Sequence, residues 1–314
     1  MISPHTSSSP AMPRGLAIGL ALAAVYVIWG STYLGIRLAL EGGFPPLLMA
    51  GGRFLVAGAM MYVVLRWRGV PTPTRAQWKN LAVMGFLMMG LGNGMVTLAE
   101  QWVSSGLAAV AVASAPLWIG LFASLRGQHP RRLEWIGLGI GFIGVVWLNA
   151  GSSLVGSPKG LVALLIAPLA WAFGSIWSRG RDMPSPFMSA SGQMLCGGAM
   201  MLAAGFATGE SFDGVPTLKG MLAVAYLMTF GSIIGFTAYI WLLDHVRPTL
   251  AGSYAYVNPV IAVMLGAWLA AERFTSHDLG AMGVILLGVV AITLAKARAP
   301  KTAASPAPTA DESA

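Results

Sequence analysis

Charged residues are scarce in this sequence: aspartate, glutamate, lysine and arginine make up 10% of its 314 residues, whereas soluble domains carry about 25%. Cysteine occurs once, as Cys196, which excludes an intrachain disulfide and a cysteine-based metal cluster. The four histidines, His5, His129, His245 and His277, are not spaced as metal ligands. The sequence also lacks a glycine-rich phosphate-binding loop with its lysine. We therefore expect no metal, no cofactor, no enzyme activity and no ATP-driven pump within this chain.

What the sequence has in excess is apolar residues, at 56% of the chain with a mean hydropathy of +0.71. A helix that crosses a bilayer needs about 20 predominantly apolar residues. Apolar runs lie at residues 16–36, 46–65, 81–99, 105–125, 134–149, 160–178, 187–207, 219–243, 249–271 and 279–296. The sequence therefore predicts an all-α membrane protein with ten transmembrane helices, surrounded by the lipid bilayer.

The basic residues indicate how these helices are oriented. If the N-terminus is cytoplasmic, most of the 19 lysines and arginines fall in cytoplasmic loops. The exceptions are Arg37, Arg53, Lys159, Lys219 and Arg273. Because cytoplasmic loops of membrane proteins are enriched in lysine and arginine, we expect both termini in the cytoplasm. The net charge of +8 then reflects these loops, and we expect no nucleic-acid partner.

The chain contains an internal repeat. Gly-Ala-Met-Met at residues 58–61 recurs at 198–201, and Gly-Val-Val at 144–146 recurs at 288–290, at offsets of 140 and 144 residues. Matches at similar offsets indicate two homologous halves. Each half holds five apolar runs, so the second half must enter the membrane from the opposite face. Inverted repeats of this kind are a recurring architecture of secondary transporters.

The repeat also gives the expected domain boundaries. The first five-helix repeat is expected at residues 16–149 and the second at 160–297. Residues 1–13 and 299–314 are rich in serine, proline, alanine and threonine and lack an apolar period, so we expect two disordered tails.

Several motifs resemble a known family. The stretch from Ala238-Tyr239 through Asn258-Pro259 to Glu272-Arg273-Phe274, before a glycine-rich last helix, resembles the EamA module of the drug/metabolite transporter superfamily. Ile28–Tyr33, Gly92–Glu100 and Ser253–Val260 are most similar to the YedA-type permeases within it. The resemblance covers about residue 16 to 297. It implies a ten-helix inner-membrane permease, usually an exporter of small metabolites or amphipathic compounds.

The chain departs from the family at one motif. Gln128-His129-Pro130 replaces the glutamate motif of the first half, whereas the second half keeps Glu272. We therefore assign this motif no symmetric role in transport.

Two prolines inside apolar runs indicate where a binding site lies. Pro116 and Pro259 occupy matching positions of the two halves, and a proline in a transmembrane helix frees a backbone carbonyl for a ligand. Tyr254, Tyr256 and Asn258 precede Pro259, and their polar groups need partners in hydrocarbon. We predict that these residues line a substrate cavity; the alternative is a kink that only shapes helix packing.

Asn93, Thr97 and Glu100 share one stripe of the third predicted helix at α-helical spacing. We predict that this stripe forms one wall of a substrate pathway, with Glu100 as the proton-coupling carboxylate because burial favours its protonated form. The alternatives are that Asn93 joins two helices by a hydrogen bond and that Glu100 lies in water outside the membrane.

Arg53 lies seven residues beyond Pro46, about 10 Å into the second predicted helix at 1.5 Å per residue. A charge at this depth must be paired or must line water. Arg53 either pairs with Glu41 or Glu100 and holds helices together, or binds an anionic group of a substrate. The counterpart of Arg53 in the second half is Gln193.

Aromatic residues with polar groups are further candidates for substrate binding: Trp29, Tyr33, Trp171 and Tyr239. Their alternative place is the membrane interface. Separately, the Gly-x-x-x-Gly motifs at 137–141 and 231–235 permit close helix contact, either within one copy or between two copies. The sequence thus leaves a homodimer open.

We predict a secondary transporter that exports a small organic solute by alternating access, coupled to protons. The cavity is expected between the first, third, fourth, sixth, eighth and ninth helices. The candidate residues favour a neutral or zwitterionic amphipath as substrate. The alternatives are an uncoupled facilitator, a membrane protein that transports nothing, and a lipid-modifying enzyme.

Overall fold

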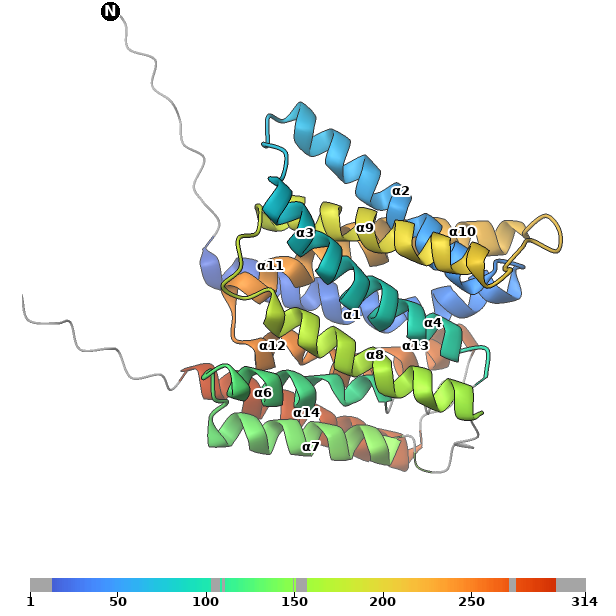
Figure 1. Cartoon of the computed structure of the whole chain (residues 1–314). Coiled ribbons are helices and arrows are strands. Elements are labelled where there is room, and N and C mark those ends of the chain that lie inside the picture. Colours follow the sequence, from blue (N-terminus) through green and yellow to red (C-terminus); the bar gives the residue numbers. More distant parts are fainter. Residues whose placement is uncertain are drawn as a thin grey trace, which may run out of the picture.

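The computed structural model describes residues 13–102, 108, 111–148, 150, 157–270 and 275–297, and Figure 1 shows that these residues form helices joined by short connections. No strand occurs in these ranges. The predicted tails at 1–13 and 299–314, apart from residue 13, lie outside the described residues, and so does Glu272.

The helices of the first half begin with α1 (Arg14–Glu41) and α2 (Pro46–Trp67). The third predicted helix consists of α3 (Arg75–Met84), the π-helical segment η1 (Gly85–Gly94) and α4 (Met95–Ala99). The half ends with α6 (Ala115–Leu125) and α7 (Arg132–Leu148).

The second half repeats this order. It contains α8 (Pro158–Trp177), α9 (Pro186–Ala207), α10 (Leu218–Tyr226) with the π-helical segment η2 (Leu227–Phe236) and α11 (Thr237–His245), then α12 (Pro248–Gly252), α13 (Tyr254–Ala270) and α14 (Ser276–Ala297). The two π-helical segments lie 142 residues apart, at the same place in each half. The described part of each predicted apolar run is thus helical, apart from the turn residues Ser114, Ser178 and Ser253.

Corresponding helices of the two halves begin with the same kind of cap and end at the same kind of glycine. Thr74 and Thr217 cap the N-termini of α3 and α10 with their side-chain oxygens, because the first turn of a helix leaves backbone N–H groups without partners. Gly69 and Gly209, with φ of +79° each, follow the ends of α2 and α9, where glycine adopts a left-handed conformation at little cost.

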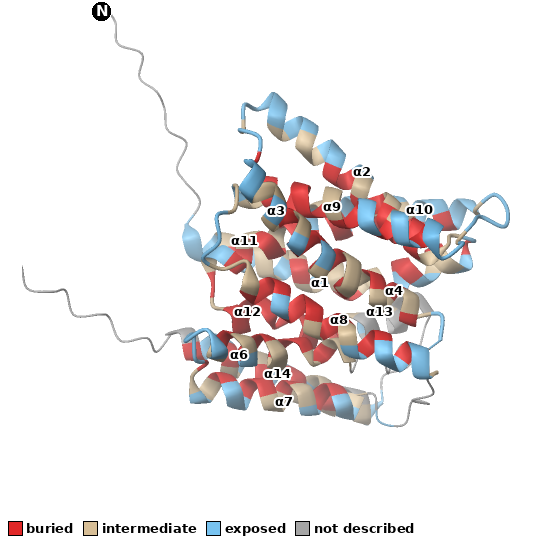
Figure 2. Ribbon diagram, in the orientation of Figure 1, coloured by how far each residue is buried: buried red, intermediate tan, exposed pale blue. Residues whose placement is uncertain are grey.

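The helices have the length and surface of a membrane protein. Within the described ranges, six helical stretches are long and apolar enough to cross a membrane, and Ala111–Leu125 and Leu279–Ala295 are shorter apolar helices. Large apolar side chains face outward, such as Leu165 (60% exposed), Ile143 (62%) and Leu287 (64%). Figure 2 shows the buried residues gathered along the inner faces of the helices. An exterior of this kind suits lipid.

Contacts between helices repeat when the two halves are exchanged. α2 packs on α9 and α7 on α14, which are pairs of equivalent helices. α1 packs on α13 as α6 packs on α8, and η2 contacts α2 as η1 contacts α9. Figure 1 shows α1 and α8 running in opposite directions. The two halves are therefore related by an approximate two-fold axis that passes between them.

Glycines let the equivalent helices approach closely. A Cβ atom on Gly288 of α14 would lie 2.6 Å from the backbone nitrogen of Gly141 and 2.8 Å from the carbonyl oxygen of Gly137 in α7. Gly231 and Gly235 likewise face Thr32 and Trp29 of α1. Both Gly-x-x-x-Gly motifs are thus used inside one chain, so they give no support to the homodimer that the sequence leaves open.

The two ends of the bundle hold different parts of the chain. α1 begins and α14 ends at the termini end, whereas α1 ends and α2 begins at the distal end. In Figure 1 the termini end lies at the left and the distal end at the right.

Candidate functional site

A cavity lies between the two halves. Its empty volume, measured together with the opening to solvent, is about 740 Å³. It is lined from all six helices predicted to surround it and also from α2. On α1 the lining residues run from Trp29 to Ile36, which is the distal half of that helix. On α2 they are Arg53 and Phe54, close to the distal start of the helix. The cavity thus reaches from the middle of the bundle toward its distal end.

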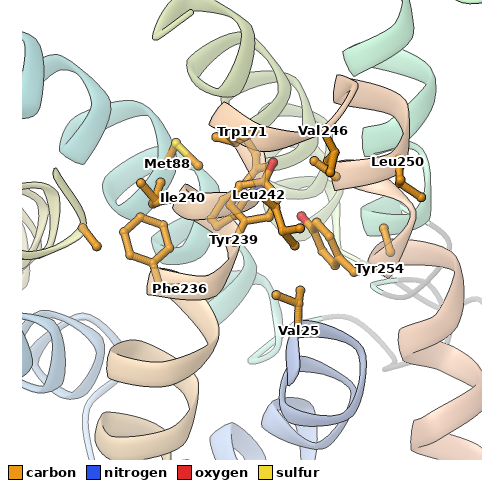
Figure 3. Packing of buried hydrophobic residues seen from close by; sticks show 14 of the residues in the cluster. Val25, Met88, Trp171, Phe236, Tyr239, Ile240, Leu242, Val246, Leu250 and Tyr254 are labelled. Carbon is orange, nitrogen blue, oxygen red and sulfur yellow. The ribbon is translucent and has the colours of Figure 1, made fainter. Parts of the chain in front are cut away.

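The base of the cavity is aromatic. Trp29, Trp171 and Tyr254 line it, and the ring centroids of Trp29 lie 5.5 Å from Trp171 and 4.7 Å from Tyr254, both edge to face. Tyr239 packs behind them, 5.2 Å from Trp29 and 5.4 Å from Trp171. Figure 3 shows Trp171, Tyr239 and Tyr254 side by side. These rings offer a large apolar contact surface to a ligand.

The two tryptophans are held in equivalent ways by the two halves. Trp171 of α8 packs on Gly92 of η1, where a Cβ atom would lie 2.8 Å from the ring. Trp29 of α1 packs on Gly235 of η2, where a Cβ atom would lie 2.6 Å from Nε1. A π-helical segment, frequent at functional sites, thus faces each tryptophan with a glycine.

Among the described residues that line the cavity, one carries a charge. Arg53 is 4% exposed, and its terminal nitrogen donates a 2.9 Å hydrogen bond to Oδ1 of Asn93, which also lines the cavity. Its Nε has no hydrogen-bond partner among the described residues, and its guanidinium lies 4.5 Å from the ring centre of Phe54. The guanidinium therefore keeps donors available for an anionic group.

The structural ion pairs considered for Arg53 are not formed. Glu41 pairs with Arg37 at 2.8 Å on the surface of α1. Glu100 lies near enough to Arg53 for their charges to interact, but no ion pair within 4.0 Å joins Arg53 and Glu100, both described residues. Tyr33 lines the cavity and Glu100 does not. The neutral partner Asn93 takes the place of the expected carboxylate.

Three predicted residues are engaged elsewhere. Thr97 is fully buried and donates its hydroxyl to the carbonyl oxygen of Asn93 at 3.0 Å, within its own helix. Tyr256 donates its hydroxyl to the carbonyl oxygen of Leu138 in α7 at 3.0 Å. Pro116 packs against α12 at Gly252. None of the three is among the residues that line the cavity.

Asn258, Pro259 and Tyr239 lie buried behind the cavity rather than in its wall. Asn258 lies beside the hydroxyl of Tyr33, and its Oδ1 has no hydrogen-bond partner in the described part of the chain. Tyr239 accepts a hydrogen bond from Nε1 of Trp171 at 3.2 Å.

Sequence reasoning missed part of the wall. Pro168 lies inside α8 and lines the cavity, and a proline within an apolar run is a signal that could have identified it. Thr32, Met89 and Phe236 also line the cavity, but they look like ordinary residues of apolar helices. The π-helical segments that carry Met89 and Phe236 have no sequence pattern that we recognise.

The termini end is closed by a polar network around Glu134 of α7. Its carboxylate is 1% exposed and accepts hydrogen bonds from the backbone N–H of Arg131, Nε of Arg247 and the hydroxyl of Thr249, at 2.7, 2.8 and 2.6 Å. Arg247 and Thr249 belong to the second half. The network therefore ties the two halves together at this end.

Two further contacts close the same end nearer the cavity. The hydroxyls of Tyr26 and Ser253 lie 2.6 Å apart, and those of Ser175 and Tyr239 lie 2.8 Å apart. Apolar side chains fill the space around them, as Figure 3 shows for Leu242, Val246 and Leu250 beside Tyr239 and Tyr254. The bundle is thus packed at one end and hollow toward the other.

Comparison with known proteins adds sequence relatives. A model of the EamA-like transporter family matches the chain twice, at residues 16–150 and 158–294. The uncharacterized inner membrane transporter YedA of Escherichia coli (strain K12) is 46% identical over 277 residues, which cover 88% of this chain and 90% of that protein. The uncharacterized transporter YvbV of Bacillus subtilis (strain 168) is 27% identical, with 91% and 94% covered.

Two more similarities are informative about family and fold. Protein PecM of Dickeya dadantii (strain 3937) is 27% identical over 84% of this chain and 86% of its own length. One crystal structure matches with a TM-score of 0.76 and 22% identity, covering 91% of this chain and all of the other. At that identity the structure supports the fold alone.

Proposed function

Because this chain belongs to the EamA-like transporter family, we propose that it is a secondary active transporter that exports small organic metabolites or amphipathic compounds across the inner membrane by alternating access. Ten helices cross the membrane as two inverted five-helix repeats, with both termini in the cytoplasm. The distal end then faces outward, and the described conformation is open toward the outside and closed at the cytoplasmic side. The family's description as transporters favours this over an enzyme.

The observation that carries the proposal is a cavity at the junction of the two halves, hollow toward one end and packed at the other. A solute site at the repeat interface is the expected arrangement for inverted-repeat transporters. A scaffold without transport activity has no need for a buried guanidinium beside such a cavity, because an unpaired charge in the membrane interior is costly.

The cavity wall supports a particular kind of solute. Trp29, Trp171 and Tyr254 provide apolar ring faces, and Arg53 provides a cation with free donors. Carboxylates form strong charge-assisted hydrogen bonds with guanidinium groups. We therefore take the substrate to be a small amphipath that carries a carboxylate next to an apolar body, as a zwitterionic solute does.

Three probes test this substrate class in proteoliposomes. L-Phenylalanine carries both ring and carboxylate, L-alanine lacks the ring, and phenyltrimethylammonium lacks the carboxylate. We expect counterflow of labelled L-phenylalanine above that of protein-free liposomes and little movement of the other two. Movement of the cation in preference to L-phenylalanine would contradict the role given to Arg53, and movement of none of a wider panel of metabolites would favour the non-transporting alternative.

We assign proton coupling to Glu100, a carboxylate that follows α4 and whose charge interacts with that of Arg53. One pH unit corresponds to about 1.4 kcal/mol, so exchange of one proton per solute supports about tenfold accumulation. We expect Glu100→Gln to reduce this accumulation to about the external concentration while solute exchange without a gradient persists. Accumulation in wild-type vesicles that ignores the pH gradient would instead indicate an uncoupled facilitator.

A further inference from the structure

Gln193 of α9 carries a buried side-chain amide. Its side chain is 0% exposed, and neither its Oε1 nor its Nε2 has a hydrogen-bond partner among the described residues. Buried polar side chains are normally hydrogen-bonded, so an amide that lacks every partner requires an explanation. α9 packs against α2, η1, α3 and α11, and Gln193 is fully buried in this helix.

Gln193 is the counterpart of Arg53. The two positions are 140 residues apart, the same offset that relates the Gly-Ala-Met-Met segments five residues further along both helices. Their surroundings correspond as well, because α2 contacts η2 and α9 contacts η1. Arg53 lines the cavity in the described conformation, whereas Gln193 does not.

Exchanging the roles of the two halves gives the opposite conformation of an inverted-repeat transporter, in which the termini end is open and the distal end closed. This step rests on the function proposed above. In the exchanged arrangement, Gln193 takes the place that Arg53 holds now. Asn258 takes the place of the lining residue Ala115, at an offset of 143, and its orphan Oδ1 gains access to the cavity as well.

We propose that Gln193 binds the solute in the conformation that is open at the termini end. An amide both donates and accepts hydrogen bonds, so it suits the carboxylate and the ammonium group of a zwitterion. In that conformation the side-chain amide of Gln193 and the Oδ1 of Asn258, which have no hydrogen-bond partner among the described residues, bind the solute. Arg53 and Gln193 contact the solute in alternate states.

Cysteine accessibility tests this without any knowledge of the substrate. Cys196 is first replaced by serine, and then Gln193→Cys, Arg53→Cys and Ala190→Cys are made one at a time. Sealed vesicles of either orientation are treated with a membrane-impermeant methanethiosulfonate. We expect Gln193→Cys to react at least about tenfold faster when the termini end faces the reagent, and Arg53→Cys to show the opposite preference. Ala190, buried on the same helix with no lining counterpart, is the matched control and is expected to react from neither side.

The outcomes separate the inference from the proposed function. Reaction of Arg53→Cys from the distal side, with Gln193→Cys unreactive from both sides, would overturn the inference and leave a transporter with a distal opening. Reaction of neither cysteine would remove the basis of both. Reaction of Gln193→Cys from the distal side alone would place it in the present cavity and also overturn the inference.

A second variant tests binding rather than access. Gln193→Met keeps the length of the side chain and removes an amide without partners, so we expect an unchanged or higher melting temperature. The apparent affinity for L-phenylalanine added at the termini end is expected to fall at least about fivefold, while affinity measured at the distal end stays the same. Equal affinities at both ends in wild type and variant would contradict a binding role for Gln193.

Discussion

Replacing Arg53 by methionine is expected to lower the uptake rate of L-phenylalanine into proteoliposomes about 10- to 100-fold. Hydrogen bonds to charged groups contribute about 1.5 to 3 kcal/mol, and each 1.4 kcal/mol corresponds to a factor of ten. The variant should still fold, because the guanidinium is 4% exposed and incompletely paired, and a buried charge of that kind stabilises little. Initial rates at several concentrations, with melting temperature alongside, measure both effects.

Arg37 provides the matched control for that experiment. It also lies near the distal end, but its side chain is 73% exposed and pairs with Glu41 on the surface. Exposed pairs of this kind contribute about 0 to 1 kcal/mol. We expect Arg37→Met to transport as wild type does. Arg53→Lys should fall between, since lysine keeps the charge but not the planar donor fork. Wild-type rates in Arg53→Met would exclude recognition of the carboxylate by Arg53.

The overall fold was largely predictable because lipid imposes a simple rule on sequence. A span must be apolar over about 20 residues, so the runs mark the helices whatever their packing. The family match in two segments and the all-helical structure confirm a two-repeat helical membrane protein. Whether each of the ten runs crosses the membrane stays a prediction, since six helical stretches within the described residues have the full length and apolarity.

The third predicted helix is only partly predictable from its own sequence. α-Helical spacing predicts that Asn93, Thr97 and Glu100 share one stripe, and residues 95–99 between them are α-helical. The π-helical segment ends at Gly94, so it changes the register of the residues before this stripe rather than the spacing within it. Asn93 lines the cavity, whereas Thr97 is buried and bonds its own backbone. Packing of Trp171 on Gly92 accompanies this local geometry, and it involves a residue distant in sequence.

For the candidate site, the sequence predicts which types of residue line the cavity better than it predicts which individual residues do. Trp29, Tyr33, Trp171 and Tyr254 were identified because polar rings inside apolar helices need a wet or polar neighbour, and all line the cavity. Tyr256 lies in the same apolar run as Tyr254, but its ring faces α7, where Gly141 leaves room for it. Which face of α13 meets α7 depends on tertiary packing, and the residue pattern of α13 alone does not predict it.

Substituting alanine for Gly288 is expected to lower the stability of the protein by at least about 2 kcal/mol, because overpacked cores lose about 1 to 3 kcal/mol and the obstruction here is backbone. The added Cβ would lie 2.6 Å from the nitrogen of Gly141 and 2.8 Å from the carbonyl oxygen of Gly137. Backbone atoms of a helix cannot rotate away as side chains do, so α14 must separate from α7. The melting temperature in detergent, followed by reaction of the single Cys196 with a thiol-reactive dye, measures the effect.

Gly283→Ala on the same helix isolates the cause. A Cβ there would meet nothing within 4 Å among the described residues. Alanine also favours a helix over glycine by about 1 kcal/mol, so this variant should melt at the wild-type temperature or above it. The contrast matters for function as well, because α7 carries Glu134, whose bonds to Arg247 and Thr249 close the termini end. If α14 positions α7, Gly288→Ala should also open that end and speed the labelling of Gln193→Cys. Equal melting temperatures for the two glycine variants would instead show that α7 and α14 are not in close contact.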